Sequence, residues 1–354
     1  MTGPPGPPSR PSLLRASVPL APLTTLRLGG PAAWFCEAAD LETVTASVRW
    51  AAEQGLALQV LGEGSNVVFP DEGFPGLVLK VGLRGVVFQE DRDRTLARVG
   101  AGEPWDPFVR SAVERGLAGL ECLSGIPGTA GATPIQNVGA YGAEVADAVD
   151  SVLGLDLDTL QERRFAPEEC GFGYRTSRFK TGALSRVLVT EVSFRLTQGG
   201  APTVRYPELA SALAPPGSLA AVREAVLALR KRKGMVLDPA DPHSVSAGSF
   251  FTNPVLDPEA FGELLRRCRA MGIEGAVPSF PAGSLTKVPA AWLVEKAGFA
   301  KGFRKGGVGV SAKHSLALVN YGGTTRELLS LARQIQEAVS GRFGVRLEIE
   351  PVVV

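Results

Sequence analysis

The sequence predicts an α+β protein of two lobes, the first rich in strands and the second carrying more helix. With 354 residues, the chain is longer than a single hydrophobic core usually supports. Short apolar runs separated by glycine and charged residues occupy residues 56–99, which is typical of strands. Apolar residues at helical spacing dominate after residue 219. We expect the boundary between the lobes near residues 230–245.

The first lobe should begin with an amphipathic helix at Leu41–Gln54, with Asp40 as its N-cap and Gly55 as its stop. A second helix is predicted at Trp105–Arg115. The remaining apolar runs predict strands at Leu56–Leu61, Val67–Phe69, Leu77–Val81, Gly85–Gln89, Thr95–Val99, Val149–Leu157 and Arg186–Leu196.

Apolar positions three and four residues apart predict four helices in the rest of the chain, at Leu219–Lys233, Pro258–Ala270, Ala290–Ala297 and Arg326–Val339. The last residues, Val345–Val354, are expected to form one buried strand. In such a strand Glu348 and Glu350 share one face, either toward solvent or toward a site. The proline-rich residues 1–17 are predicted to be a disordered tail.

Composition excludes several classes of function. A net charge of +1 leaves no basic surface for nucleic acid or an anionic membrane, and no apolar run reaches the ~20 residues that span a bilayer. The four cysteines form no C-x-x-C pair, which argues against zinc and for a reducing compartment, so the cytoplasm is expected. With two histidines, His243 and His314, a multi-histidine metal site is nearly excluded, and we expect no metal.

The stretch Gly125–Gly142 contains five glycines and two prolines but no charged side chain. Solvated linkers are usually polar, so this composition predicts a long loop packed against protein or ligand. Glycine permits close approach of the backbone and lets several N–H groups converge on one target, most often a diphosphate. The alternative is a buried loop that binds nothing.

A second glycine-rich turn, Gly62-Glu63-Gly64-Ser65-Asn66, begins like a dinucleotide fingerprint. That fingerprint needs a helix directly after the glycines, whereas Val67, Val68, Phe69 and Pro70 predict a strand and then a break. The turn can still present N–H groups and the side chains of Ser65 and Asn66, or it can be a plain β-turn.

Two further stretches carry polar groups among aromatic residues. Arg175 lies between aromatic and cationic residues in 172–180, where an arginine can bind a carboxylate or phosphate bidentately or simply lie on the surface. Ser249 precedes Phe250 and Phe251. A serine in an apolar pocket can pass a proton if its surroundings support it, or it can bond to backbone.

Together these stretches resemble the UDP-N-acetylenolpyruvoylglucosamine reductases, over nearly all of Leu23 to Val353. The motifs that carry the resemblance occur in family order: TTLRLGG from Thr24, LGEGSN from Leu61, GIPG from Gly125, PIQNVGAYG from Pro134, GYRTS from Gly173, GSFF from Gly248 and LEIE from Leu347. Phe280 departs from the tyrosine that many members carry there.

The resemblance implies a two-part FAD-binding lobe of the vanillyl-alcohol oxidase type at 18–235. It also implies a smaller α+β substrate lobe at 236–354, whose final strand, 345–354, returns to the active site. It implies noncovalent FAD, with NADPH as the reductant. Hydride would pass through the flavin to the enolpyruvyl group of the sugar nucleotide, giving UDP-N-acetylmuramate for peptidoglycan synthesis. It also implies a class with a mobile tyrosine loop, and we expect a monomer.

Residue roles also follow from the resemblance. Ser249 matches the proton donor, and Arg175 and Glu350 match the pair that stabilises charge on the substrate carboxylate. The expected FAD contacts are Gly62, Gly64, Ser65, Asn66, Gly125, Gly128, Gln136, Asn137, Gly139, Gly142, Val189 and Arg230. The expected substrate contacts are Tyr206, Lys233, Asn253 and Lys287. The alternatives are another FAD-dependent enzyme of this fold and a sugar-nucleotide-binding protein without catalysis.

Overall fold

The computed structural model describes residues 13–213 and 217–354, which divide into two compact units. The first unit contains the described residues of Met1–Val18, Pro31–Gly64 and Phe74–Lys231. The second contains Pro19–Gly30, Ser65–Gly73 and Arg232–Val354. Each unit has its own hydrophobic core. The chain therefore crosses from one unit to the other several times before its C-terminal third.

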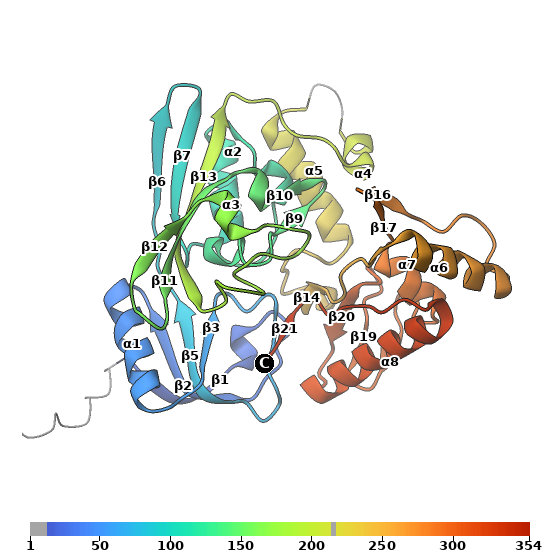
Figure 1. Ribbon diagram of the computed structural model, residues 1–354, viewed down its shortest axis with the longest axis horizontal. Coiled ribbons are helices and arrows are strands. Elements are labelled where there is room, and N and C mark those ends of the chain that lie inside the picture. The colour runs from blue at the N-terminus through green and yellow to red at the C-terminus, as the bar shows by residue number, and fades with distance from the viewer. Residues whose placement is uncertain (1–12, 214–216) are drawn as a thin grey trace, which may run out of the picture. The chain divides into compact units, whose positions relative to one another are not determined.

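Two sheets form the first unit (Figure 1). The smaller has the order β1-β2-β5-β3, in which β2 and β3 both run parallel to β5. Its strands are β1 (Arg15–Pro19), β2 (Pro31–Ala38), β5 (Phe74–Val81) and β3 (Leu58–Leu61). Helix α1 (Leu41–Glu53) lies against this sheet, and its N-cap Asp40 accepts a 2.7 Å hydrogen bond from the N–H of Thr43.

The larger sheet is antiparallel and has the order β12-β11-β13-β7-β6, with β8 also paired to β13. Its strands are β6 (Val86–Asp91), β7 (Arg94–Gly100), β8 (Leu117–Ala118), β11 (Val149–Asp156), β12 (Glu162–Phe165) and β13 (Val187–Gln198). The long central strand β13 reads Val-Leu-Val-Thr-Glu-Val-Ser-Phe, and its apolar residues after Val187 are buried. Such β-branched and aromatic residues suit a sheet covered on its faces.

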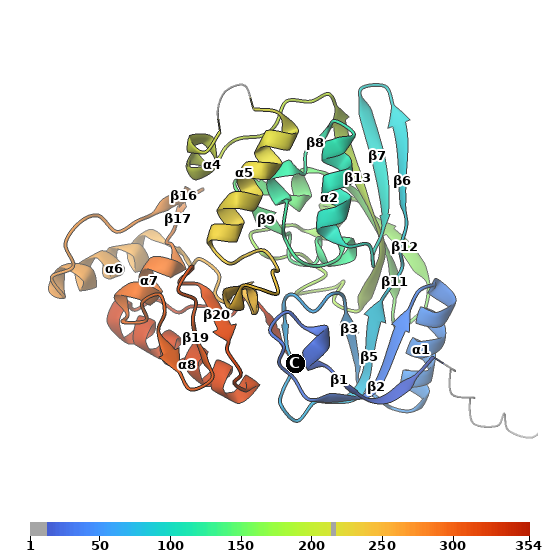
Figure 2. The same cartoon turned by 180° about the vertical axis from the view of Figure 1, so that it is seen from behind.

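The other elements of this unit are a two-stranded hairpin and four helices. They are β9 (Gly139–Ala140), β10 (Ala143–Glu144), α2 (Trp105–Glu114), α3 (Pro167–Cys170), α4 (Pro207–Ser211) and α5 (Leu219–Arg232). Short 3-10 turns lie at η2 (Glu121–Leu123), η3 (Ala130–Ala132) and η4 (Val145–Asp147). Figure 2 shows α2 and α5 from behind the view of Figure 1.

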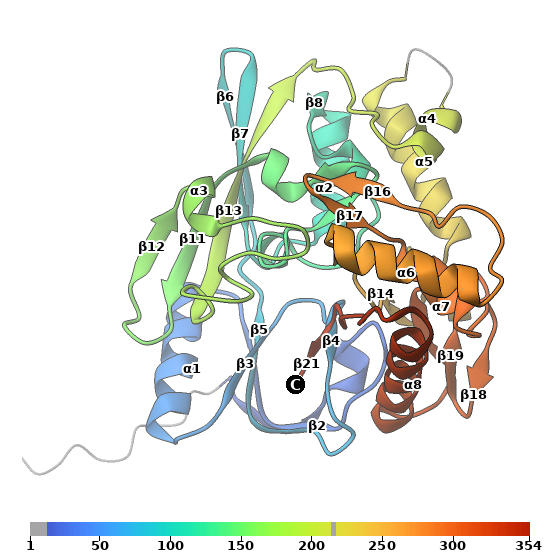
Figure 3. The same cartoon turned by 45° about the vertical axis from the view of Figure 1, so that its right-hand side comes forward.

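The second unit combines three small sheets with three helices (Figure 3). The sheets have the orders β14-β20-β19-β18, β15-β17-β16 and β21-β4. The elements are η1 (Ala21–Leu23), β4 (Val67–Val68), η5 (Pro242–Ser244), β14 (Ser246–Ser249), β15 (Val255–Leu256), α6 (Pro258–Ala270), β16 (Phe280–Ala282), β17 (Leu285–Lys287), α7 (Ala290–Lys296), β18 (Arg304–Lys305), β19 (Val308–Val310), β20 (Ala317–Asn320), α8 (Thr325–Phe343) and β21 (Val352–Val353).

Local sequence explains where the longest helix of this unit starts and stops. Thr324 and Glu327 form a reciprocal capping box at the N-terminus of α8, and Gly344 ends the helix with a φ of +71°. Its buried face carries Leu328, Leu331 and Ile335, which join the core of the second unit. Among the described residues, no helix is long and apolar enough to cross a bilayer.

Two expectations need correction. Val345–Val354 is not one buried strand: Ile349 makes an isolated bridge to Phe251, and only Val352–Val353 forms a strand, in which both valines are exposed. The break between them is at Pro351, which has no N–H to donate. Residues 1–12 of the predicted tail lie outside the described residues, but Arg15–Ser17 belong to β1, so the predicted tail is too long at that end.

Candidate functional site

Two carboxylates of the first unit accept hydrogen bonds from the backbone of the glycine-rich loop 125–142. The N–H of Gly125 donates to Asp106 Oδ1 at 2.5 Å, and the N–H of Gly128 donates to Glu63 Oε2 at 3.1 Å. Glu63 comes from the second glycine-rich turn, so the two motifs contact each other directly. A Cβ on Gly62 would also lie 2.9 Å from Thr129 Oγ1, so a larger residue there would have to displace the Thr129 side chain.

Many of the loop's peptide N–H groups bond to protein oxygens. Besides the two glycines, these are the N–H groups of Ala130, Gly131, Ala132, Thr133, Ile135 and Val138. Gly125 and Gly128 have φ values of +72° and +131°, which only glycine adopts at low cost. The loop is therefore packed and preformed, as its lack of charge predicted, and part of its hydrogen-bonding capacity maintains its own shape.

Hydrogen bonds of the Asn137 side chain connect this loop to the segment around Arg175. The Asn137 side chain is 1% exposed, donates to Glu144 Oε2 at 2.7 Å and to the carbonyl of Gly173 at 3.0 Å, and accepts from the N–H of Ala146. Both donors of the amide are thus used within the protein. Its flavin contact remains a prediction, and the structure gives the side chain an internal role as well.

Arg175 is fixed on the same loop. Its Nη2 donates to the carbonyl of Gly139 at 2.6 Å and its Nη1 to that of Asn137 at 3.4 Å, while its guanidinium lies over the Tyr174 ring. Its backbone has a φ of +55°, uncommon for a residue with a side chain. A guanidinium held in this way has a defined direction, which suits recognition of a carboxylate.

Arg230, near the end of α5, also contacts this loop. Its Nε donates to the carbonyl of Gly125 at 3.3 Å. Burial lowers the pKa of Arg230 to about 10; Tyr141 and Asp106 oppose this shift, whereas the charge of Arg175 adds to it. Arg175 and Arg230 each donate to a carbonyl of this loop, and an anion bound beside Arg230 would offset the cost of burying its charge.

Tyr206 packs edge-on against Tyr141 of the loop, with ring centroids 5.6 Å apart. Tyr206 is 40% exposed, and burial of its other part raises the pKa of its hydroxyl. The remaining predicted FAD contacts of this unit are a half-buried Gln136, the left-handed glycines Gly64 and Gly142, and Val189, which is buried on β13.

In the second unit, Ser249 and Glu350 lie on two stretches of chain that are hydrogen-bonded to each other. Ser249 ends β14, directly after Gly248 with a φ of +72°. The N–H of Glu350 donates to the carbonyl of Phe250 at 3.0 Å, and Phe250 and Phe251 are buried against each other. Glu350 is half-buried whereas Glu348 is exposed, which separates the two carboxylates that the sequence left equivalent.

Two predicted substrate contacts of the second unit are also neighbours. Asn253 Oδ1 accepts the N–H of Ala290 at 2.9 Å and so holds the start of α7. Lys287 lies in β17 opposite Val255 and Phe280. Lys233 is half-buried just beyond α5, and Ser65 and Asn66 precede β4.

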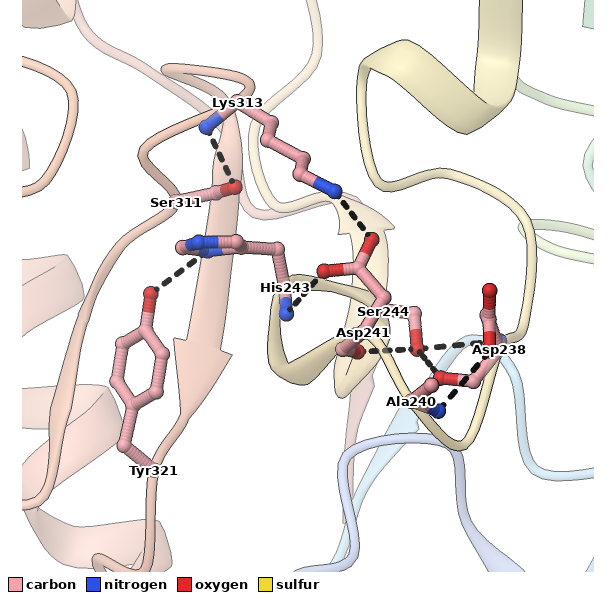
Figure 4. A network of polar contacts seen from close by, with 8 residues as sticks. All are labelled: Asp238, Ala240, Asp241, His243, Ser244, Ser311, Lys313 and Tyr321. Atoms are coloured by element: carbon pink, nitrogen blue, oxygen red, sulfur yellow. Dashed lines mark hydrogen bonds and ion pairs between the residues drawn. The ribbon is translucent and has the colours of Figure 1, made fainter. Parts of the chain in front are cut away.

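The connection from α5 to β14 is fixed by a polar network (Figure 4). Asp241 binds Lys313 Nζ at 2.8 Å and caps the N–H of His243, whose Nδ1 lies 3.0 Å from the hydroxyl of Tyr321. Arg304 stacks on the Tyr321 ring. One of the two histidines therefore has a structural partner, and sequence reasoning gave no sign of this network.

Sequence patterns do not reveal the carboxylates that hold the loop. Glu63 stands out only as part of a glycine-rich motif. Asp106 looks like an ordinary acidic residue in the first turn of a helix, and nothing in its spacing links it to Arg223, 117 residues away, which binds it.

Comparisons with known proteins bear on the whole chain. The C-terminal domain model of UDP-N-acetylenolpyruvoylglucosamine reductase matches residues 239–354, and a model of an FAD binding domain matches residues 32–160. The reductase of that name from Thermobifida fusca is 48% identical over 347 residues, covering 96% of this chain and 97% of the relative. That from Saccharopolyspora erythraea is 50% identical, covering 95% and 94%.

A comparison with a solved structure supports the same fold. The UDP-N-acetylenolpyruvylglucosamine reductase of Thermus caldophilus matches with a TM-score of 0.65 and 27% identity, covering 96% of this chain and 99% of that one. The fold class and the resemblance predicted from the motifs are confirmed. The chain belongs to the UDP-N-acetylenolpyruvoylglucosamine reductase family.

Proposed function

We propose that this protein is an FAD- and NADPH-dependent reductase that converts UDP-N-acetylenolpyruvoylglucosamine to UDP-N-acetylmuramate for peptidoglycan synthesis. The observation that carries the proposal is 48% identity to a reductase of that name across 96% of the chain. The family models match segments of both units, at residues 32–160 and 239–354.

The residues of the first unit fit a dinucleotide such as FAD. A packed, uncharged loop offers backbone beside an uncharged ring system, and Arg230 at its edge offers a cation for a phosphate. We assign FAD binding to Gly62, Gly64, Ser65, Asn66, Gly125, Gly128, Gln136, Asn137, Gly139, Gly142, Val189 and Arg230. When bound, FAD supplies the hydride that reduces the enolpyruvyl double bond, after NADPH has reduced the flavin.

Three residues of this chain stabilise the charge on the substrate carboxylate and donate the proton. Arg175, oriented by the carbonyls of Gly139 and Asn137, stabilises the negative charge that builds up on the substrate carboxylate. Glu350 assists there as a hydrogen-bonded or protonated group, since an ionised carboxylate would oppose that charge. Ser249 donates the proton to the carbon next to the carboxylate. A hydroxyl is a weak acid, so this step depends on its fixed position beside buried phenylalanines.

We assign substrate binding to Lys233, Asn253, Lys287 and Tyr206. The lysines supply cations for the diphosphate of the sugar nucleotide, and Tyr206 closes over the substrate from its loop. We further propose a cytoplasmic monomer. Four free, buried cysteines support a reducing compartment. The monomer rests on the family resemblance and is tested by the mass of the protein in solution.

The test separates the two half-reactions in a stopped-flow instrument. Ser249→Ala should be reduced by NADPH at the wild-type rate, because that step needs no proton from Ser249. Reoxidation by the enolpyruvyl sugar nucleotide should slow by about 100-fold or more, the contribution of a positioned acid. Equal slowing of both half-reactions would show that Ser249 does not act as the proton donor.

The same measurements distinguish the alternatives. An oxidase of this fold would turn over with oxygen and an alcohol and would not need the enolpyruvyl compound. A binding protein without catalysis would be colourless, would take up no FAD, and would leave NADPH unchanged.

A further inference from the structure

Helix α5 carries two arginines on one face that act on the backbone of a single loop residue, Gly125. Arg223 and Arg230 are seven residues apart, which is about two helical turns. Arg230 donates to the carbonyl of Gly125 at 3.3 Å. Arg223 acts on the N–H of the same residue through Asp106 of α2; Figure 2 shows both helices.

The carboxylate of Asp106 binds both the Arg223 guanidinium and the N–H of Gly125. Its Oδ1 accepts from Arg223 Nη1 at 2.7 Å and from the N–H of Gly125 at 2.5 Å, and its Oδ2 accepts from Arg223 Nη2 at 2.8 Å. The Arg223 side chain is 10% exposed, against 34% for Asp106. Burial by itself would raise the pKa of Asp106, but the hydrogen bonds from Arg223 and Gly125 outweigh it and lower the pKa. The carboxylate therefore stays ionised at neutral pH.

Stability alone is a weak reason for such a pair, because apolar residues of similar volume often serve as well as a buried ion pair. What an apolar pair cannot do is orient a peptide. The bidentate fork fixes the plane of the Asp106 carboxylate, and the carboxylate fixes the direction of the Gly125 N–H. Gly125 has a φ of +72°, and its carbonyl is the group that Arg230 binds.

We propose that Asp106 and Arg223 are positioning residues, which fix the backbone at Gly125, and with it the carbonyl that Arg230 binds, so that the loop is preformed for FAD. The inference rests on the proposed function, because it takes FAD as the ligand. Neither residue needs to touch the cofactor. Binding to a preformed loop avoids the entropic cost of ordering that loop, so loss of either residue weakens FAD binding.

The experiment titrates apoprotein with FAD and follows flavin fluorescence and visible circular dichroism, with thermal unfolding of the apoprotein as a separate readout. Asp106→Asn keeps the shape but loses the charge, and Arg223→Lys keeps the charge but loses the fork. Each should weaken FAD binding by about 10- to 100-fold and change the visible dichroism of the bound flavin. The matched control is Asp158→Asn, which breaks an exposed ion pair with Arg186 in the same unit and should leave FAD binding unchanged.

A double swap, Asp106→Arg with Arg223→Asp, separates positioning from simple pairing. It restores an ion pair between α2 and α5 but turns a donor toward the N–H of Gly125, so the apoprotein should regain stability without regaining FAD affinity. Single variants that bind FAD as tightly as wild type, or a swap that restores the affinity, overturn the proposal. A wild-type protein that takes up no FAD overturns the proposed function, and this inference with it.

Discussion

Glu63 places a carboxylate inside the first unit, where it accepts the N–H of Gly128. Burial raises its pKa above the ordinary value of 4.5, although the Gly128 hydrogen bond and the charges of Lys80 and Arg84 oppose the shift. As the pH rises above that ordinary value, the unfolded chain releases this proton first. The folded protein therefore loses stability relative to the unfolded chain until the pH passes the raised pKa.

This gives a pH-dependent prediction for Glu63→Gln, which cannot ionise. The free energy of unfolding of the wild type should fall relative to that of the variant as the pH rises above 4.5, and the difference should level off once the pH has passed the raised pKa. Urea unfolding across this pH range measures it. A difference that does not change with pH, or that changes in the opposite direction, would mean that burial does not control the ionisation of Glu63.

Single residues differed in how well the sequence revealed them. Arg175 and Ser249 could be singled out because an arginine among aromatics and a serine beside two phenylalanines are chemically conspicuous. Alternation alone does not separate Glu348 from Glu350, because it predicts one shared face, and only the family resemblance singles out Glu350. The structure exposes Glu348 and half-buries Glu350. Asp106 could not be found, because its partner is remote in sequence.

The glycine-rich loop 125–142 was predictable as an element, because a long uncharged stretch cannot remain in water. How it is held was not predictable. Its anchors include side chains from three other segments, Asp106, Glu63 and Arg230, and one side chain of the loop itself, Asn137.

Replacing Asn137 tests how much its hydrogen bonds contribute to stability. Asn137→Ala leaves Glu144, Gly173 and Ala146 without their partner and places alanine, which adopts a φ of +46° less readily than asparagine, at this position. We expect a loss of about 3 kcal/mol in the free energy of unfolding, measured with urea. Asn137→Gly removes the same bonds without the backbone strain and should lose about 1 kcal/mol less. If the two variants are equally stable, the left-handed backbone costs nothing here.

Helices with clear caps were predicted closely; α6 has the expected bounds, and α1 has the expected N-cap. The C-terminal stretch was not, because a run rich in valine fits one strand as well as two. Its first part pairs with Phe251 and its last part with β4, and that choice of partners is made by tertiary structure.

At the scale of the whole molecule, the second unit is assembled from three separate pieces of sequence. Leu26 and Leu28 from the first piece and Val68 from the second are buried in its core beside residues of the third. β4 pairs with β21, and Thr325 of α8 donates to the carbonyl of Phe69 at 2.7 Å. Sequence patterns assign residues to consecutive stretches, so they cannot indicate such an arrangement.

This arrangement predicts the behaviour of residues 236–354 produced as a fragment. Without Pro19–Gly30 and Ser65–Gly73 the fragment exposes part of its core and leaves β21 unpaired, so it should show poorly dispersed amide resonances and no cooperative unfolding. The full-length protein is the control. A fragment with a well-dispersed spectrum and a sharp melting transition would show that the first two pieces contribute little to its stability.

The pairing of β4 with β21 also has a consequence for biosynthesis. Val67 and Val68 leave the ribosome early, whereas Val352 and Val353 are among the last residues made. Throughout most of translation, the apolar side chains of Leu26, Leu28 and Val68 have none of their core partners from α8 available. Nascent chains of this protein should therefore depend on ribosome-associated chaperones until synthesis is nearly finished.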